Sequence, residues 1–381
     1  MQQGNPKRTL SLQQEAIYKK YVEDRGVDFE YVKRRRYRIS SEVYENLFGK
    51  EVDVPIGHII SGKSTLYDEN GKRLLQWVKT GNDKNFSQEI IEEIIEGINE
   101  KIDQATPLPP TKKDYQSNII NQYTLTDFHL GMMAWGEETG DDWDLNIAEE
   151  LVIDWFRHAI SHSPNAESCI FAQIGDFLHW DGLLAVTPAS KHVLDADTRR
   201  TKLIRISLKI IRQIVSMLLA KYKKVHILMA EGNHDEDSSI WLREVFKFHY
   251  ENEPRITVDT NPDPYYYYEF GSTLLFYHHG HKQRNIKGIE TVFISKQKQA
   301  YGKSKNCYAH MGHWHQDESE TNLMKVERHR TLAAKDAHAS RSGYASGRDA
   351  KVITYHKEFG EVARMTINPE MVKHFNKIEN E

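Results

Sequence analysis

The sequence predicts an α/β fold in which layered sheets are flanked by helices. After about residue 115, short apolar segments typical of strands alternate with longer amphipathic segments typical of helices. A proline-rich stretch at 105–114 (ATPLPPTKKD) separates this part from a smaller N-terminal one. A hairpin pattern at 351–367 adds two strands near the end of the chain. We therefore expect a main domain at 115–381, a linker at 105–114 and a small α/β extension at 1–104.

The N-terminal part should contain helices and one hairpin. Segments 9–25 and 28–48 have the pattern of helices, and 87–103 carries isoleucines on one face behind the capping residue Ser87. Between them, two strand-like runs flank an Asn-Gly pair within 64–79. Asn-Gly is the strongest short-range signal for a two-stranded hairpin.

In the main domain the expected strands and helices alternate. We expect helices near 145–161 and 200–221. The expected strands lie near 121–126, 168–174, 224–230 and 273–278, with a less clear one at 306–311.

The net charge of −4 over 381 residues neither favours nor excludes a nucleic-acid partner. Charge is unevenly distributed, since residues 1–50 carry 11 Lys/Arg and 7 Asp/Glu. A basic cluster lies here, consisting of Lys33, Arg34, Arg35, Arg36 and Arg38. It is either a contact to a nucleic-acid backbone or the solvated face of a helix, and the glycine pattern of a helix-turn-helix is not clear.

Cysteine usage and the N-terminus favour a cytoplasmic protein. The two cysteines, Cys169 and Cys307, lie in no metal-binding spacing and form no disulfide framework. The N-terminus is polar, and no run of about 20 apolar residues suggests a membrane span. The sequence leaves the oligomeric state open.

Five short polar clusters, all after the proline-rich stretch, carry the chemistry. They are Asp127–His129 (DFH), Gly175–Asp176, Gly232–Asp235 (GNHD), His278–His281 (HHGH) and Gly312–His315 (GHWH). Four of them directly follow an expected strand, which is where α/β folds place their sites. Imidazole with carboxylate suits divalent metals of the Mn²⁺, Fe²⁺, Zn²⁺ and Ni²⁺ kind. Residues two apart at a strand end point to the same side, which suits both DFH and GHWH.

These five motifs, in this order, resemble those of the calcineurin-like metallophosphoesterases over about residues 120–320. The resemblance implies a four-layer α/β/β/α sandwich and two divalent ions. Mn²⁺ is the first expectation, with Fe²⁺, Zn²⁺, Ni²⁺ and Mg²⁺ as alternatives. It also implies two ligand sets sharing Asp176. The first adds Asp127, His129 and His315, and the second adds Asn233, His279 and His313.

The same resemblance implies in-line hydrolysis of a phosphoester by a water shared between the two metals. His234 would lie beside the scissile phosphate, oriented by Asp235. The stretches 125–145 and 332–349 are also similar to bacteriophage-encoded metallophosphoesterases described as DNA-repair exonucleases. We therefore expect a DNA nuclease, acting as an exonuclease or an endonuclease in the cytoplasm of a bacterial host. The alternatives are a phosphodiesterase or phosphatase for a cyclic or oligomeric nucleotide, and a metal-stabilised nucleic-acid-binding protein without catalysis.

Several residues near the motifs are candidates for substrate contacts. His179 stands where many members of that family carry an acid or Asn, so it lines the substrate groove or packs within its loop. His281 is expected beside the metal ligand His279. Arg199 and Arg200 either contact phosphate or form the solvated start of a helix.

Overall fold

The computed structural model describes residues 19, 22, 58–67, 73–82, 114–188, 192–283, 285–314, 318–341, 343 and 347–380. Several expectations lie outside these residues, namely the helices 28–48 and 87–103, the basic cluster Lys33–Arg38 and the ligand His315. Of the helix 9–25 only Lys19 and Val22 are described, and both are helical. The chain divides into two compact units, Met1–Gln88 and Glu89–Glu381. The proline-rich stretch follows this division, and its role as a linker stays a prediction.

In the first unit, β1 (His58–Tyr67) and β2 (Arg73–Asn82) form an antiparallel hairpin. The pair Ser64 and Trp77 lies opposite in its register, as the Asn-Gly signal predicted. Both strands are longer than the sequence pattern indicated.

The second unit contains a six-stranded sheet in the order β13-β12-β3-β4-β5-β6. Its parallel part consists of β3 (Gln116–Leu125), β4 (Ala166–Ile174), β5 (Lys224–Ala230) and β6 (Ile256–Val258). The antiparallel hairpin β12 (Ala350–His356) and β13 (Gly360–Ile367) joins it along β3. The hairpin expected at 351–367 is thereby confirmed.

A five-stranded sheet in the order β10-β11-β9-β8-β7 lies over the first. It contains β7 (Tyr266–Phe270), β8 (Thr273–Tyr277), β9 (Asn306–Met311), β10 (Glu318–Glu320) and β11 (Lys325–Arg328). β8, β9 and β11 are parallel, and the edge strands β7 and β10 are antiparallel to their neighbours.

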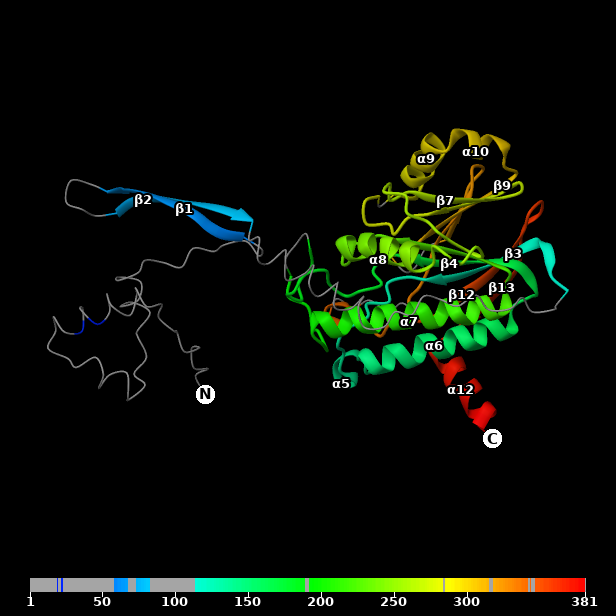
Figure 1. Ribbon diagram of the computed structural model, residues 1–381, viewed down its shortest axis with the longest axis horizontal. Coiled ribbons are helices and arrows are strands. Elements are labelled where there is room, and N and C mark those ends of the chain that lie inside the picture. Colours follow the sequence, from blue (N-terminus) through cyan, green and yellow to red (C-terminus); the bar gives the residue numbers. More distant parts are fainter. Residues whose placement is uncertain are drawn as a thin grey trace. The chain divides into compact units, whose positions relative to one another are not determined.

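Helices cover the outer face of each sheet (Figure 1). The helices α6 (Leu145–His162), α7 (Arg200–Lys221) and α8 (Glu236–His249) pack against the six-stranded sheet. α9 (Ile286–Lys296) and α10 (Lys298–Lys303) cover the five-stranded sheet. The helices expected at 145–161 and 200–221 are confirmed to within one residue.

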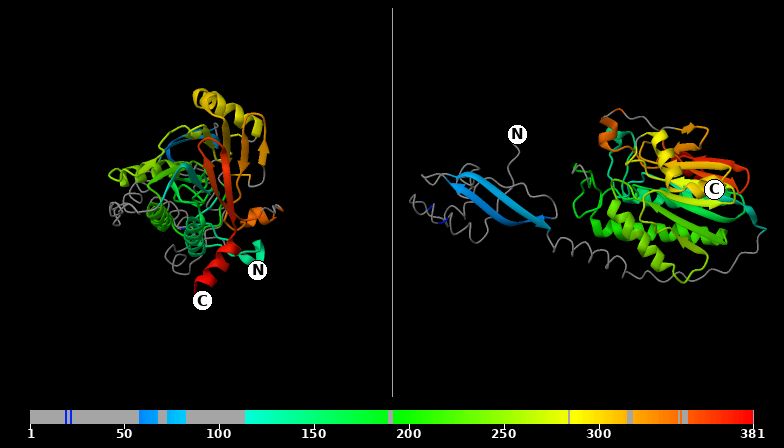
Figure 2. Two further views of the ribbon diagram at one scale, coloured as in Figure 1. Left: turned by 90° about the vertical axis from the view of Figure 1, so that its right-hand side faces the viewer. Right: turned by 90° about the horizontal axis from the view of Figure 1, so that it is seen from above.

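Three smaller helices complete the described part of this unit. α5 (Gly136–Thr139) and α11 (Ala337–Arg341) contact each other, and Arg341 pairs with Glu138 between them. α12 (Pro369–Asn380), drawn in red in Figure 2, lies against α6. None of the helices in the described residues is long and apolar enough to cross a membrane.

Three separate apolar cores show that the unit has four layers. Alternate residues of a strand point to opposite faces, so Leu275 and Tyr277 pack between the sheets, whereas Leu274 and Phe276 pack against Phe293 of α9. The largest core lies between the six-stranded sheet and its helices. The predicted α/β/β/α sandwich is therefore confirmed. The tyrosines at 265–268 divide between layers, and Tyr266 is fully buried between the sheets.

Candidate metal centre

All five polar clusters lie at the carboxyl ends of strands. Asp127 follows β3, Asp176 follows β4 and Asn233 follows β5, and these three strands are parallel neighbours. His279 follows β8 and His313 follows β9, which are parallel neighbours in the second sheet. The two sheets thus bring side chains that are far apart in the sequence to one edge of the sandwich.

The backbone is left-handed at four of these positions. Asp127, His129, Asp176 and His313 have φ of 50°, 47°, 51° and 66°, and they are the non-glycine residues with positive φ in the described part of the chain. This conformation costs energy for residues with a Cβ, and strained residues cluster at functional sites. The fold therefore holds these side chains in place against a local preference.

Four of the predicted metal ligands converge. Asp127, Asp176, His279 and His313 each offer a ligand atom, and these atoms lie within 4.8 Å of one another. Nε2 of His279 is 3.0 Å from Oδ2 of Asp176 and 3.9 Å from Oδ1 of Asp127. The other ring nitrogen, Nδ1, lies 2.8 Å from the carbonyl oxygen of Ile174. Because a carbonyl only accepts, Nδ1 carries a proton, and Nε2 is the nitrogen that faces the carboxylates and can bind a metal once its own proton is displaced.

The motif glycines are needed for the close approach of these ligands. A Cβ at Gly232 would lie 1.9 Å from Oδ1 of Asp176, and one at Gly312 would lie 2.5 Å from Oδ2 of Asp127. A Cβ at Gly175 would lie 2.5 Å from the ring of His279. No side chain fits at these three positions unless a ligand moves.

Hydrogen bonds fix both carboxylates. Oδ2 of Asp127 accepts from Oγ1 of Thr126 at 2.6 Å and from the backbone N of His313 at 2.9 Å. Oδ1 of Asp176 accepts from the backbone N of His234 at 2.8 Å. Each bond joins two different motif loops or a motif to the end of its strand, so the ligands are oriented before any ion binds.

The electrostatics of this group favour a bound cation. Burial lowers the pKa of His279, but the carboxylates of Asp176 and Asp127 outweigh it and raise that pKa to about 10. Burial likewise opposes ionisation of Asp176, yet His279 and His234 hold its pKa well below the usual range. Two buried carboxylates thus draw a proton onto the imidazole between them. A divalent ion can replace that proton, so the residues fit a metal.

Asn233 has an unpaired side-chain oxygen in the same loop as His234. Its Oδ1 is buried and has no hydrogen-bond partner among the described residues. Buried polar atoms are nearly always paired, so an unpaired buried oxygen indicates an ion or a water as its partner. The role of Asn233 in metal binding stays a prediction.

His129 lies in a second group with His179 and His234, and their ligand atoms are within 4.8 Å of one another. Nδ1 of His129 is 3.3 Å from Nδ1 of His179, and the ring centroids of His129 and His234 are 4.7 Å apart. Burial and the neighbouring His234 lower the pKa of His129 to about 4. Neutral imidazoles are the form that binds a metal. His179, predicted near the substrate, lies within this cluster of imidazoles and is fully buried.

Asp235 differs from its predicted role. Its carboxylate accepts from the backbone N of Asp176, Leu178 and Gly232, at 3.2, 3.0 and 3.1 Å. Nδ1 of His234 is instead 2.9 Å from the carbonyl oxygen of His179. Asp235 therefore braces two motif loops, and a backbone carbonyl orients His234. Burial and the carboxylate of Asp176 raise the pKa of Asp235 to about 7.

The loop after His279 contains two further polar side chains. The ring of His281 lies 5.4 Å from that of His279, and neither of its nitrogens has a hydrogen-bond partner among the described residues. Nζ of Lys282 lies 2.7 Å from Glu231 and 3.2 Å from Glu236. Lys282 thus ties this loop to the one that carries Asn233, and no motif in the sequence marks it for that role.

The two arginines expected near substrate are placed differently from each other. Arg199 is exposed and directly precedes α7. Arg200 is buried and donates to the carbonyl oxygen of Trp180 and to Oγ of Ser238, both at 2.5 Å. The carboxylate of Asp181 accepts from the backbone N of Ser238 at 2.9 Å. Arg200 therefore joins the loop after Asp176 to the start of α8 and does not face solvent as a phosphate ligand would.

Thr331 is a supporting residue that the sequence did not reveal. Its Oγ1 donates to the carbonyl oxygen of Asp127 at 2.6 Å, across 204 residues of sequence. No motif marks this position. Thr126, in contrast, directly precedes Asp127 and could have been suspected from the sequence alone.

A third group of possible ligands, in the described part of the chain, contains His310, Glu327 and His329. Nδ1 of His310 is 2.8 Å from Nε2 of His329. The Glu327 carboxylate already accepts from Lys351 and Arg364, at 2.5 and 2.7 Å. Two cations on one carboxylate disfavour a divalent ion, so we interpret this group as a buried polar network between the sheets.

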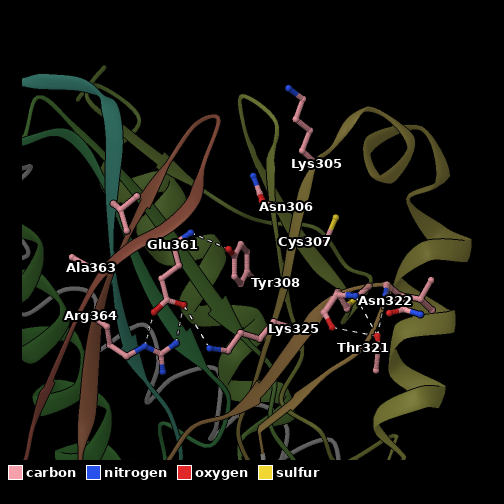
Figure 3. Close-up of a pocket in the computed structure, with 13 residues that line it drawn as sticks. Lys305, Asn306, Cys307, Tyr308, Thr321, Asn322, Lys325, Glu361, Ala363 and Arg364 are labelled. Atoms are coloured by element: carbon pink, nitrogen blue, oxygen red, sulfur yellow. Dashed lines mark hydrogen bonds and ion pairs between the residues drawn. The ribbon is translucent and has the colours of Figure 1, made fainter.

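An open groove of about 530 Å³ lies at the other end of β9, around Asn306 and Tyr308 (Figure 3). Its wall contains Lys325 and Arg364, and Glu361 pairs with both of them at 3.9 and 2.7 Å. The ligand loops follow the carboxyl end of the same strand. This groove is therefore separate from the metal centre, and two of its cations, Lys325 and Arg364, are already engaged.

No family model and no curated protein matches the chain. Its structure is similar to a dimetal phosphatase from Danio rerio, with a TM-score of 0.35, 9% identity, and coverage of 65% of this chain and 98% of that one. It is also similar to a 5′-nucleotidase from Candida albicans, with a TM-score of 0.34, 13% identity, and coverage of 71% and 55%. For a 5′-nucleotidase precursor from Thermus thermophilus the values are 0.29, 10%, 68% and 58%.

The chain thus spans little more than half the length of either nucleotidase. Likeness of this degree does not establish an activity. The function has to be inferred from the side chains of this chain.

Proposed function

We propose that this chain is a two-metal phosphoesterase that hydrolyses phosphodiesters. The observation that carries the proposal is the convergence of Asp127, Asp176, His279 and His313 within 4.8 Å, next to a second group of three histidines. Carboxylate and imidazole ligands of this kind hold divalent ions of the Mn²⁺ or Zn²⁺ class. His279 and His313 reach the site from the second sheet, because each follows one of two parallel strands.

Asp176 is the residue best placed to serve two ions. Its Oδ2 lies beside His279, while its Oδ1 meets the backbone of His234, whose ring belongs to the second group. The resemblance assigned Asp127 to the ion of His129, but Asp127 lies with the other group. One ion would therefore be held by Asp127, Asp176, Asn233, His279 and His313. The other would be held by His129 and Asp176, with His315, which lies outside the described residues, as the further predicted ligand. When bound, such a pair of ions lowers the pKa of water and offsets phosphate charge.

His234 is the proposed proton-transfer residue. The carbonyl oxygen of His179 can only accept, so Nδ1 of His234 carries a proton. This leaves Nε2 as the nitrogen that can take a proton from water or give one to the leaving oxygen. The contact also fixes the ring, which lies 4.7 Å from that of His129. A positioned acid or base of this kind contributes about 100- to 10,000-fold to a rate.

DNA is the substrate we propose, with Mn²⁺ as the first metal to test. This proposal draws on the motif resemblance of residues 120–320 and on the basic cluster Lys33–Arg38. A segment that binds a polyanion needs such cations. The half-buried ring of His281 lies beside His279, and its nitrogens have no hydrogen-bond partner among the described residues, so it is a further candidate donor to a phosphate oxygen.

A panel of metals and substrates tests the proposal. Purified full-length protein is assayed with Mn²⁺, Zn²⁺ and Mg²⁺ on labelled DNA, RNA and cyclic nucleotides, beside Asp176→Ala. We expect Mn²⁺-dependent DNA cleavage that the variant lacks. Asp263→Ala is the matched control, because Asp263 pairs with Lys296 in an exposed ion pair.

The outcomes separate the alternatives. Cleavage of cyclic nucleotides alone would identify a small-nucleotide enzyme. Stoichiometric metal binding without any hydrolysis would identify a metal-stabilised binding protein and end the proposal of catalysis.

A further inference from the structure

Trp314 is an exposed aromatic side chain next to the metal centre. It directly follows the ligand His313, and the centroids of the two rings are 5.1 Å apart at an interplanar angle of 89°. Trp143, Trp155 and Trp180 are at most 1% exposed, whereas Trp314 is 37% exposed and Trp135, which precedes α5, is 60% exposed. Exposing part of an indole forgoes the apolar burial that the first three obtain. A tryptophan exposed beside a catalytic centre thus suggests a ligand that it contacts.

Arg328 supports this ring. The residue ends β11 and lies opposite Met311 in the register with β9, so it is fixed by the sheet. Its guanidinium carbon is 5.8 Å from the centroid of the Trp314 ring, and the residue is 9% exposed. A cation at this distance interacts favourably with the aromatic ring. The indole is therefore held between the edge contact with His313 and the guanidinium of Arg328.

We propose that Trp314 is a stacking platform for the nucleobase attached to the scissile phosphate. Every base has an aromatic face, so a stacking contact accepts different bases and is typical of proteins that bind single-stranded nucleic acid. A base on this ring would be one residue away from a metal ligand, which suits a nucleotide whose phosphate is at the centre. The proposal rests on the proposed phosphodiesterase function and makes its substrate a nucleotide.

The experiment compares substrates that differ only in the base. A short thymidine oligonucleotide, the same oligonucleotide with abasic sugars, and a thymidine mononucleotide ester are used with wild type, Trp314→Ala and Trp314→Phe. Cleavage with Mn²⁺ gives kcat/KM. Fluorescence anisotropy in EDTA gives binding of both oligonucleotides without turnover. Phe359→Ala is the matched control, because Phe359 is 71% exposed in the turn between β12 and β13, at the opposite edge from the ligand loops.

We expect Trp314→Ala to weaken binding and kcat/KM for the thymidine oligonucleotide by about fivefold to 150-fold, the range for loss of one stacked base. Binding and cleavage of the abasic oligonucleotide should be unaffected by Trp314→Ala. Trp314→Phe should retain most of the wild-type binding and kcat/KM for the thymidine oligonucleotide, and Phe359→Ala should resemble wild type. Equal losses on both oligonucleotides would show that Trp314 only supports the fold, and no loss on either would overturn the proposal.

The two proposals can fail separately. If wild type cleaves no phosphodiester but binds thymidine oligonucleotide through Trp314 in EDTA, catalysis is refuted and stacking stands. If wild type cleaves both oligonucleotides equally and binds both equally, catalysis stands and stacking is refuted. An effect of Trp314→Ala on the mononucleotide ester alone would identify a free nucleotide as the source of the base.

Discussion

Replacing Gly232 by alanine should weaken metal binding with little change elsewhere in the fold. The added Cβ would lie 1.9 Å from Oδ1 of Asp176 and 2.3 Å from its backbone N. Real Cβ atoms essentially never approach closer than 3.0 Å, so one of the two loops has to move by about 1 Å. Overpacking of this kind costs about 1–3 kcal/mol of stability. A displacement of 1 Å at a reacting centre costs about 100-fold in rate.

Calorimetric titration with Mn²⁺ and the rate of DNA cleavage measure the two consequences. For Gly232→Ala we expect weaker Mn²⁺ binding and at least about 100-fold slower cleavage. Far-UV circular dichroism should remain like that of wild type. Gly302→Ala in α10 is the control, because a Cβ there meets nothing within 4 Å. Wild-type metal affinity and activity in Gly232→Ala would refute the close packing of Asp176 against this loop as a condition for the site.

Three other perturbations test separate parts of the structure. His234→Ala should retain its metal content, measured by mass spectrometry, and its turnover should fall by about 100- to 10,000-fold. The control His374→Ala, at an exposed position, should remain active. Loss of metal from His234→Ala would contradict the role of His234 in proton transfer. Burial lowers the pKa of His329 to about 4, so the unfolded chain binds more protons below pH 6.5 and stability falls as the pH falls. Urea unfolding should show that His329 lowers the free energy of unfolding by about 2 kcal/mol between pH 7 and pH 5. The free energy of unfolding of His329→Gln should depend less steeply on pH. Equal slopes for the two proteins would refute the contribution of His329. EDTA should lower the Tm, and Mn²⁺ should restore it. At a free Mn²⁺ concentration of about a hundred times Kd, the free energy of unfolding should rise by about 2.7 kcal/mol. Asp176→Ala should show no such shift.

The sequence predicted those parts of the molecule in which one local pattern decides the structure. The helix α7 (Arg200–Lys221) has the predicted bounds because its apolar residues repeat at helical spacing over all of its 22 residues. The ligands Asp127, Asp176, His279 and His313 were recognisable because each follows an apolar strand and belongs to a short motif. For these elements the local signal and the fold agree.

Contacts between distant segments could not be predicted in this way. Thr331 supports Asp127 from 204 residues away, and nothing at either position indicates the other. The partner predicted for Asp235 was wrong. Its carboxylate accepts from backbone N–H groups of two loops, and the sequence does not show that these groups come within reach. The sequence likewise allowed Arg200 to be a surface cation, because it does not show that Ser238 of α8 lies against the guanidinium.

The left-handed backbone at Asp127, His129, Asp176 and His313 limits how this centre can evolve. Asp, Asn and His are the side-chain-bearing residues that tolerate this conformation best, and β-branched residues are the ones it rejects. Random mutagenesis with selection for a folded protein should therefore return mainly those three residues and glycine at these codons, and selection for metal binding should remove glycine. A change of metal preference would have to come from neighbours in ordinary conformations, such as Thr126 and Thr331, because the coordinating positions admit so few replacements.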